Sequence, residues 1–176
     1  MILPADAGGT DSEMKIHGTH QINGARERIF AALVDPQVLQ RCIPGCESLE
    51  KTAESTYLAT MKAGVGAVKG TFKGSVRLEE IQAPSHYRMI VEGKGGPGFV
   101  KGTGEFDLAE TDGTTAIAYS GDMQVGGVIA SVGQRMIEAA AKMLAGRFFT
   151  ELEKQIGLND QPQLAITQEP GSTPAP

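Results

Sequence analysis

The amino-acid sequence predicts an α+β fold, in which a curved antiparallel sheet of about seven strands wraps around one long C-terminal helix. Three observations support this prediction. The last apolar run of the chain has the period of a helix, the residues before it alternate as strands do, and two short helical segments follow the first strand. A helix with one apolar stripe and a sheet with one apolar face bury these surfaces against each other.

The C-terminal helix is predicted over residues 128–157. Its apolar residues recur at spacings of three and four, while charged residues fall mostly on the other side. The apolar stripe consists of Ile129, Val132, Met136, Ile137, Ala140, Met143, Leu144 and Phe148. At about 1.5 Å per residue, this helix reaches roughly 40 Å and needs a comparably long surface to cover it.

The length of 176 residues suits one folded domain, which we expect over residues 14–157. Residues 1–13 are rich in Ala, Asp, Gly and Thr, and we expect them to form a flexible leader. Residues 158–176 contain four prolines and no aromatic residue, a composition typical of a disordered tail.

The first part of the domain is predicted to contain a strand and two short helices. Residues 15–22 alternate between apolar and polar side chains, as a strand does. Asn23 is expected to cap a helix over residues 26–34. The dipeptide Asp35-Pro36 ends this helix and begins a second short one, which runs through Leu39.

A meander of strands is predicted between these helices and the C-terminal helix. The strands cover residues 48–51, 56–65, 68–81, 87–92, 99–108 and 115–125. Their alternation gives each strand one apolar and one polar face, as in antiparallel sheets that are solvated on one side. The connections include Asp112-Gly113 and Ala83-Pro84-Ser85, which suit tight turns.

Composition and charge exclude several classes of function. The formal net charge of −5 argues against nucleic-acid binding. The amino terminus does not resemble a secretion signal, and no apolar run approaches the ~20 residues of a membrane-spanning helix. A cytoplasmic protein is therefore expected. Cys42 and Cys46 lie near a turn without neighbouring metal ligands, and we interpret them as reduced thiols.

The apolar faces of the predicted strands and helix suggest a ligand cavity. They combine small residues with flexible methionines, which suits an adaptable apolar pocket, although methionine clusters also occur in solid cores. The candidate cavity residues are Met61, Phe72, Met89, Phe106, Tyr119, Met123, Met136, Ala140 and Met143. The glycine-rich connection Gly95-Gly96-Pro97-Gly98 is a candidate gate loop, because glycine leaves its backbone loosely constrained.

A basic stripe is expected on the outer side of two neighbouring strands. It consists of Lys62, Lys69, Lys73 and Arg77. Such a stripe is either a solvated face or a docking surface for an acidic partner or lipid headgroups.

Catalytic and metal-binding patterns are not found in the sequence. There is no phosphate-binding loop, and the three histidines do not have the spacing of a zinc protease. Only His20 and Tyr119 qualify as an acid or base inside the cavity, which is thin support for an enzyme. We therefore predict no catalytic residue and no metal site.

Three separated blocks resemble the G-subunit family of carbon monoxide dehydrogenase. The first block reads Asp35-Pro36, Leu39 and Cys42-Ile43-Pro44-Gly45, and the second is the glycine-studded run of residues 65–74. The third covers residues 125–137 at the start of the long helix, and Phe148-Phe149 near its end also matches. The resemblance extends over about residues 14–157. This family belongs to the START/polyketide cyclase-like SRPBCC superfamily, which has the helix-grip fold.

The resemblance implies an accessory protein of an aerobic CO dehydrogenase-type molybdenum hydroxylase. Such a protein would bind a quinone (menaquinone or ubiquinone), or another small apolar ligand, between sheet and helix. It would also help to couple the enzyme to the respiratory chain at the inner face of the membrane. Residues 163–176 are polar and rich in proline, so we expect transient membrane contact or recruitment by the partner rather than a stable anchor.

Three functions follow from these observations. The leading hypothesis is a non-enzymatic module that binds an apolar ligand in the cavity. The second is a cyclase or dehydratase-type enzyme on the same fold, which would use His20 and Tyr119. The third is a docking or assembly factor whose cavity is filled by its own side chains and which acts through the basic stripe.

Overall fold

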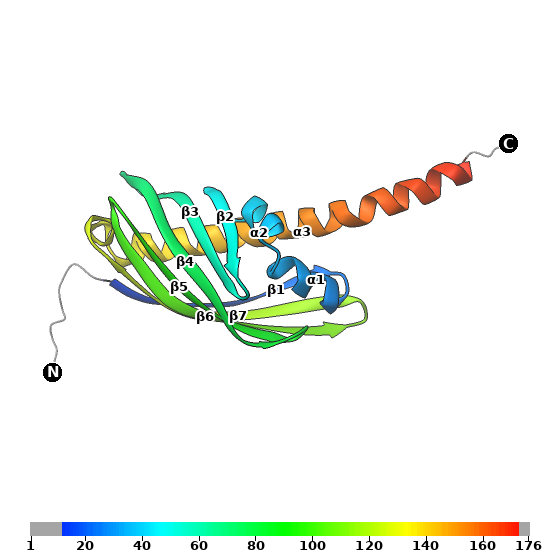
Figure 1. Ribbon diagram of the computed structural model, residues 1–176, viewed down its shortest axis with the longest axis horizontal. Coiled ribbons are helices and arrows are strands. Elements are labelled where there is room, and N and C mark those ends of the chain that lie inside the picture. Colours follow the sequence, from blue (N-terminus) through cyan, green and yellow to red (C-terminus); the bar gives the residue numbers. More distant parts are fainter. Residues whose placement is uncertain (1–11, 173–176) are drawn as a thin grey trace.

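A computed structural model describes residues 12–172, and it confirms the predicted α+β architecture (Figure 1). The strands are β1 (Ser12–Asn23), β2 (Cys46–Ala53), β3 (Thr56–Val65), β4 (Val68–Gln82), β5 (His86–Gly95), β6 (Gly98–Thr111) and β7 (Thr114–Gly126). The helices are α1 (Arg26–Leu33), α2 (Pro36–Cys42), the 3-10 helix η1 (Val128–Val132) and α3 (Gln134–Ser172).

The seven strands form one antiparallel sheet in the order β1-β7-β6-β5-β4-β3-β2. Consecutive strands from β2 to β7 are neighbours, and β1 joins the sheet beside β7. The sheet curves around α3, which runs along it and extends past its end (Figure 1). Helices α1 and α2 lie at this same end, where α2 contacts both α3 and β2.

The two short helices begin in different ways. Asp35 caps α2, since its Oδ1 accepts a hydrogen bond of 2.9 Å from the backbone N–H of Gln37, and Pro36 takes the first helical position as predicted. The expected cap of α1 by Asn23 is wrong. Ala25 is the N-cap of α1 and has no side-chain cap bond. Asn23 instead ends β1 and accepts a 3.2 Å hydrogen bond from the hydroxyl of Thr114.

The long helix begins later than the sequence indicated. Residues 128–132 form the separate 3-10 turn η1, because Gly127 and Gly133 on either side have φ of +89° and +102°. The helix α3 proper therefore starts at Gln134. It continues beyond Gly157 to Ser172, since Gly157 does not take the left-handed conformation that commonly ends helices.

The described part of the chain also starts before the predicted domain boundary. Strand β1 begins at Ser12, whereas the strand was predicted from residue 15 and the domain from Met14, because Ser12 and Met14 pair with Val125 and Met123 of β7. Residues 1–11 of the expected leader and residues 173–176 of the expected tail lie outside the described residues.

Helix α3 is held against the sheet through two clusters of buried apolar residues. One cluster includes Phe149, Leu152 and Ile156 of α3 together with residues of α1, α2 and the strands. The other cluster surrounds η1 and includes Ile129 and Ile137. The helix is therefore fixed near both ends of its contact with the sheet.

We predict that Leu152→Ala lowers the free energy of unfolding by about 2–5 kcal/mol. Leu152 is fully buried, so its truncation leaves a void between α3 and its neighbours. Lys142→Ala on the exposed side of the same helix serves as the control and should change stability by less than ~0.5 kcal/mol. Denaturant unfolding measures the free energy of unfolding of both variants. Equal losses in the two variants would contradict the proposed role of Leu152 in packing α3 against its neighbours.

Candidate ligand-binding site

A cavity of about 320 Å³ lies between the sheet and α3. Its lining residues on the strands are Ile16, Leu49, Tyr57, Met61, Val76, Leu78, Tyr87, Met89, Val91, Thr103, Gly104, Phe106, Tyr119, Ser120, Gly121 and Met123. Its lining residues on the helices and the α2–β2 turn are Leu33, Leu39, Ile43, Pro44, Leu144, Ala145, Phe148 and Phe149. Among the described residues, no charged side chain and no histidine lines this space.

Glycines on the inner face of the sheet create part of this space. Gly104 of β6 lies between Met89 of β5 and Gly121 of β7 in the strand register. A Cβ atom on Gly104 would find its nearest neighbour, the Met89 methyl group, at an uncrowded 3.5 Å. Gly102 acts differently, because a Cβ there would lie 2.3 Å from the carbonyl oxygen of Asp122 and 2.6 Å from the Met123 sulfur. Gly104 therefore opens the cavity, and Gly102 lets Met123 pack closely.

An aromatic wall forms one side of the cavity. The rings of Tyr87 and Phe106 stack with centroids 4.9 Å apart, and Phe106 lies 6.4 Å from Tyr119. Phe149 of α3 completes the row, 5.1 Å from Tyr119. Rings arranged in this way offer flat apolar surface for a planar ligand.

Tyr119 depends on a glycine of the neighbouring strand. Gly18 of β1 is paired with Tyr119, and a Cβ atom on Gly18 would lie only 2.5 Å from the tyrosine Oη and 2.7 Å from Cζ. Any other residue at position 18 would push the Tyr119 ring out of its place. No local pattern of the sequence marks Gly18, because its importance follows from the pairing of β1 with β7, two strands far apart in the chain.

Two of the three tyrosines that line the cavity have raised pKa values. Burial, with a smaller contribution from Tyr57, raises the pKa of Tyr87 above its usual value. Burial and then the charge of Asp35 also raise the pKa of Tyr57, whose hydroxyl donates a 2.8 Å hydrogen bond to the Val34 carbonyl. Both groups are therefore neutral at pH 7, and the Tyr57 hydroxyl is already engaged.

Five of the nine predicted cavity residues line the cavity. They are Met61, Met89, Phe106, Tyr119 and Met123. Phe72 is buried instead in the cluster around η1, where it contributes to the core. All five lining residues come from strands, whose alternation correctly identified the inner face.

The predicted cavity residues of α3 do not line the cavity. Met136 and Met143 are 46% and 57% exposed, and Ala140 is half-buried outside the lining. The helix turns Ile137 and Leu144, each one residue further along, toward the sheet. A shift of one residue rotates a side chain by about 100° around the axis. Apolar residues occupy both faces here, so periodicity alone could not select the inner one.

The cavity reaches the surface beside Leu144. This residue lines the cavity and is also 36% exposed, and Ile43 and Pro44 of the α2–β2 turn belong to the same lining, while α2 packs against α3. The opening therefore lies between this turn and α3. The sequence had identified Ile43-Pro44 only as part of a turn and a family motif.

The candidate gate loop lies elsewhere and does not line the cavity. Pro97 is buried, and its carbonyl accepts a 2.8 Å hydrogen bond from the backbone N–H of Ile129. A Cβ atom on Gly70 would lie 2.4 Å from the Pro97 ring, which shows how closely the loop packs on β4. This placement of Gly95, Gly96, Pro97 and Gly98 gives no support to the gate hypothesis.

His20 lies beside the cavity rather than in its lining. Its ring stacks on Phe149 at 4.8 Å, and its Nε2 contacts the carboxylate of Glu153 on α3. Of the two candidate acid or base groups, only Tyr119 lines the cavity. Only one of the two groups that the enzyme hypothesis requires therefore lines the cavity.

The predicted basic stripe is partly neutralised by neighbouring carboxylates. Lys62 forms a 3.2 Å ion pair with Glu47, and Arg77 forms a 3.0 Å ion pair with Glu79. Lys73 lines a separate hollow on the outer face, which also contains Glu50 and Glu92. Lys69 is exposed on the same strand. Mixed charge makes this surface less favourable for an acidic partner than the sequence indicated.

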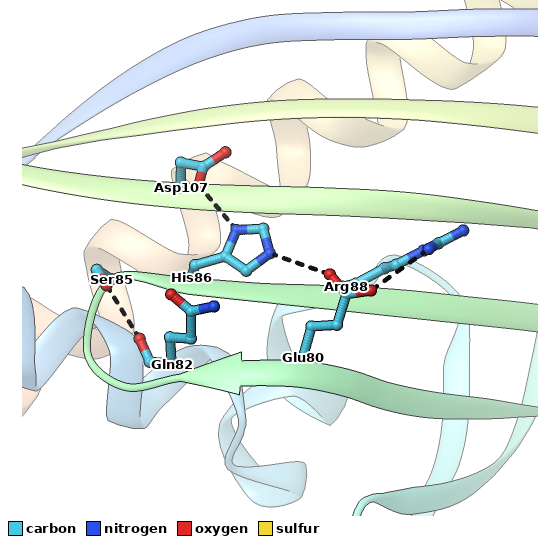
Figure 2. Close-up of polar contacts among 6 residues, drawn as sticks. All are labelled: Glu80, Gln82, Ser85, His86, Arg88 and Asp107. Atoms are coloured by element: carbon cyan, nitrogen blue, oxygen red, sulfur yellow. Dashed lines mark hydrogen bonds and ion pairs between the residues drawn. The ribbon is translucent and has the colours of Figure 1, made fainter.

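A polar cluster lies on the outer face of the sheet, away from the cavity (Figure 2). The Nδ1 atom of His86 lies 2.8 Å from Asp107, and its Nε2 atom lies 4.0 Å from Glu80. The hydroxyl of Ser85 donates to the Gln82 carbonyl rather than to the histidine. The cluster therefore lacks the serine–histidine contact of a nucleophilic site.

The part of the chain that the structure describes contains neither a metal-binding group of side chains nor a reactive thiolate. No group of three or more His, Cys, Asp or Glu residues there could hold a metal ion. Burial is the main cause that raises the pKa of the Cys42 thiol to about 11, and it also raises the pKa of Cys46. Both cysteines are therefore thiols rather than thiolates at neutral pH.

Comparison with known proteins agrees with this architecture. The family described as CoxG, the G subunit of carbon monoxide dehydrogenase, matches residues 18–157. A conserved protein from Geobacillus kaustophilus is 38% identical in its crystal structure, with a TM-score of 0.79, and the match covers 82% of this chain and 95% of that one. No protein with a curated description matches this sequence.

More distant structures share the fold alone. A START superfamily protein from Mycobacterium smegmatis is 12% identical, with a TM-score of 0.63, over 82% of this chain and 97% of that one. The Zhui aromatase/cyclase from Streptomyces sp. R1128 is 11% identical, with a TM-score of 0.64, over 83% and 94%. No helix among the described residues is long and apolar enough to cross a membrane.

The family match extends over most of the domain, and the seven-stranded sheet and the long C-terminal helix match the fold of the START-like neighbours. The chain therefore belongs to the carbon monoxide dehydrogenase G-subunit (CoxG) family and has the START/SRPBCC helix-grip fold.

Proposed function

We propose that this protein is a non-catalytic accessory protein that holds an apolar, quinone-like ligand between sheet and helix. The observation that carries the proposal is the 320 Å³ cavity, whose lining in the described chain is free of charged groups, in a member of the CoxG family. A neutral ligand loses little solvation on entering such a space, whereas an ionised ligand would lose much more.

The shape of the lining suggests how a quinone is oriented. The planar ring packs against the aromatic wall of Phe106, Tyr119 and Phe149, and the Tyr119 hydroxyl donates to a quinone carbonyl. Apolar contact contributes about 25 cal/mol for each Å² removed from water. The cavity is at the small end of the usual ~300–1,000 Å³, so a long isoprenoid tail continues through the opening beside Leu144.

The family match supports the proposed partner and location. The partner is a molybdenum hydroxylase of the CO dehydrogenase type, and the ligand is menaquinone or ubiquinone. The side chains of Met136, Met143 and Leu144 are exposed on α3, and Leu144 lines the cavity while Met143 lies beside Ile43 and Pro44 of the α2–β2 turn. They support a transient contact with the cytoplasmic face of the membrane, where the ligand is exchanged.

We predict that the protein, when purified from its native host and extracted with organic solvent, releases about one quinone per chain. Mass spectrometry of the extract identifies the compound. A lipid-binding protein of similar size, treated in parallel, controls for extraction. An empty extract from this protein beside a loaded control would contradict the proposed ligand and favour a docking function without one.

We predict that Gly104→Leu weakens binding of menadione, a small naphthoquinone, by at least about tenfold. The new side chain projects into the open space at Gly104 and occupies the volume of the ligand. Gly96→Leu is the control, since Gly96 lies in a turn with no atom within 4 Å of the position that a Cβ atom would take. Titration calorimetry compares the two, and unchanged affinity in folded Gly104→Leu would place the ligand elsewhere.

We predict that Tyr119→Phe lowers menadione affinity by about threefold to tenfold, the usual value of one hydrogen bond. The same substitution leaves the affinity for 2-methylnaphthalene, which lacks the carbonyls, unchanged. This pair of ligands separates the hydroxyl from the packing of the ring. Equal losses for both compounds would show that Tyr119 acts through packing alone.

A further inference from the structure

A second hollow adjoins the opening of the cavity. It is a groove of about 800 Å³ between α3 and the segment that contains the end of α2 and the α2–β2 turn. Ile43 and Pro44 belong to the linings of both the groove and the cavity. The two spaces are therefore neighbours on either side of one short turn, and a ligand that leaves the cavity passes the groove.

Two arginines line this groove. Arg41 comes from α2 and Arg147 from α3, and both are exposed. Arg41 makes one long hydrogen bond of 3.4 Å to the side chain of Gln155. Arg147 has no ion pair or hydrogen bond with another residue of the described chain. Its guanidinium group is therefore available to a ligand.

One carboxylate shares the groove, but a lysine partly neutralises it. Glu151 lines the groove and lies 3.2 Å from the Nζ atom of Lys154. The groove thus has a positive balance in a chain whose formal net charge is −5. Gly146, one residue before Arg147, has no atom within 4 Å of the position that a Cβ would take. The surface of α3 beside Arg147 is therefore not covered by other side chains.

We propose that the groove binds the anionic head group, a carboxylate or a phosphate, of an amphiphile whose apolar chain enters the cavity. The guanidinium fork of arginine matches the paired oxygens of both groups. The chain of the amphiphile passes Ile43, Pro44 and Leu144 into a space that excludes charge. This ligand class differs from a neutral quinone, and the inference does not depend on the proposed function.

The test compares dodecanoate with dodecan-1-ol, two ligands with the same chain and different heads. Calorimetry on the wild-type protein below the micellar concentration should show tighter binding of the acid. The double variant Arg41→Gln/Arg147→Gln should lose about tenfold or more of the affinity for dodecanoate and keep that for the alcohol within about twofold. Lys51→Gln/Lys94→Gln, which removes two exposed cations outside the groove, should leave both affinities unchanged.

Each further result supports or overturns the inference. If wild-type protein binds the acid no more tightly than the alcohol, or if the arginine variant loses both equally, the groove is not an anion subsite. Loss of dodecanoate binding in Gly104→Leu supports entry of the chain into the cavity. If Gly104→Leu still binds dodecanoate, and inorganic phosphate displaces the bound dodecanoate, the groove is a site for free anions and the proposal of an amphiphile is overturned.

Different ligands test the anion subsite in the groove and the quinone site in the cavity, so either proposal can be contradicted without the other. Menadione carries no charge, so its affinity should be the same in the arginine variant and in the wild-type protein. Failure of the wild-type protein to bind menadione would contradict the quinone proposal while the comparison of acid and alcohol still decides the role of the groove.

Discussion

The packing of α3 against the inner face of the sheet is the constraint on which the rest of the structure depends. Ile137 near the start of the helix, and Phe149, Leu152 and Ile156 further along, bury the helix at two places. Between these two places the sheet carries Gly104, which has no side chain, and the cavity separates the sheet from α3. Protein interiors normally close such gaps, because unfilled volume forfeits contacts. A space kept open between two well-packed clusters is the expected arrangement of a carrier.

The distribution of charge follows from this arrangement. Ionised groups are costly to bury without partners, and none of the described charged residues lines the cavity. Burial raises the pKa values of Tyr57 and Tyr87 further above neutral pH, since the charged form of a buried hydroxyl loses its hydration. In the two proposals, the cavity holds the apolar part of a ligand, and polar recognition falls to Tyr119 inside and to the two arginines outside.

The same fold supports different chemistries in proteins with little sequence identity. The structures of a START superfamily protein and of an aromatase/cyclase resemble this one at 12% and 11% identity. Function must therefore be argued from the side chains that line the cavity. Here the lining combines aromatic rings, methionines and glycines, and His20 is engaged beside the cavity by Phe149 and Glu153. This combination favours binding over acid–base catalysis.

The sequence by itself determined the strands, the two short helices and the family, because alternation, the Asp35-Pro36 cap and three ordered motifs are local features of the chain. It also identified five of the cavity residues that lie on strands, since a strand has only two faces, although Phe72 on the same kind of face belongs to the core around η1. Only the tertiary structure decided which face of α3 points inward, why position 18 must be glycine beside Tyr119, and that Arg41 and Arg147 share a groove. These features depend on helix rotation and on pairing between distant segments, which no local pattern encodes.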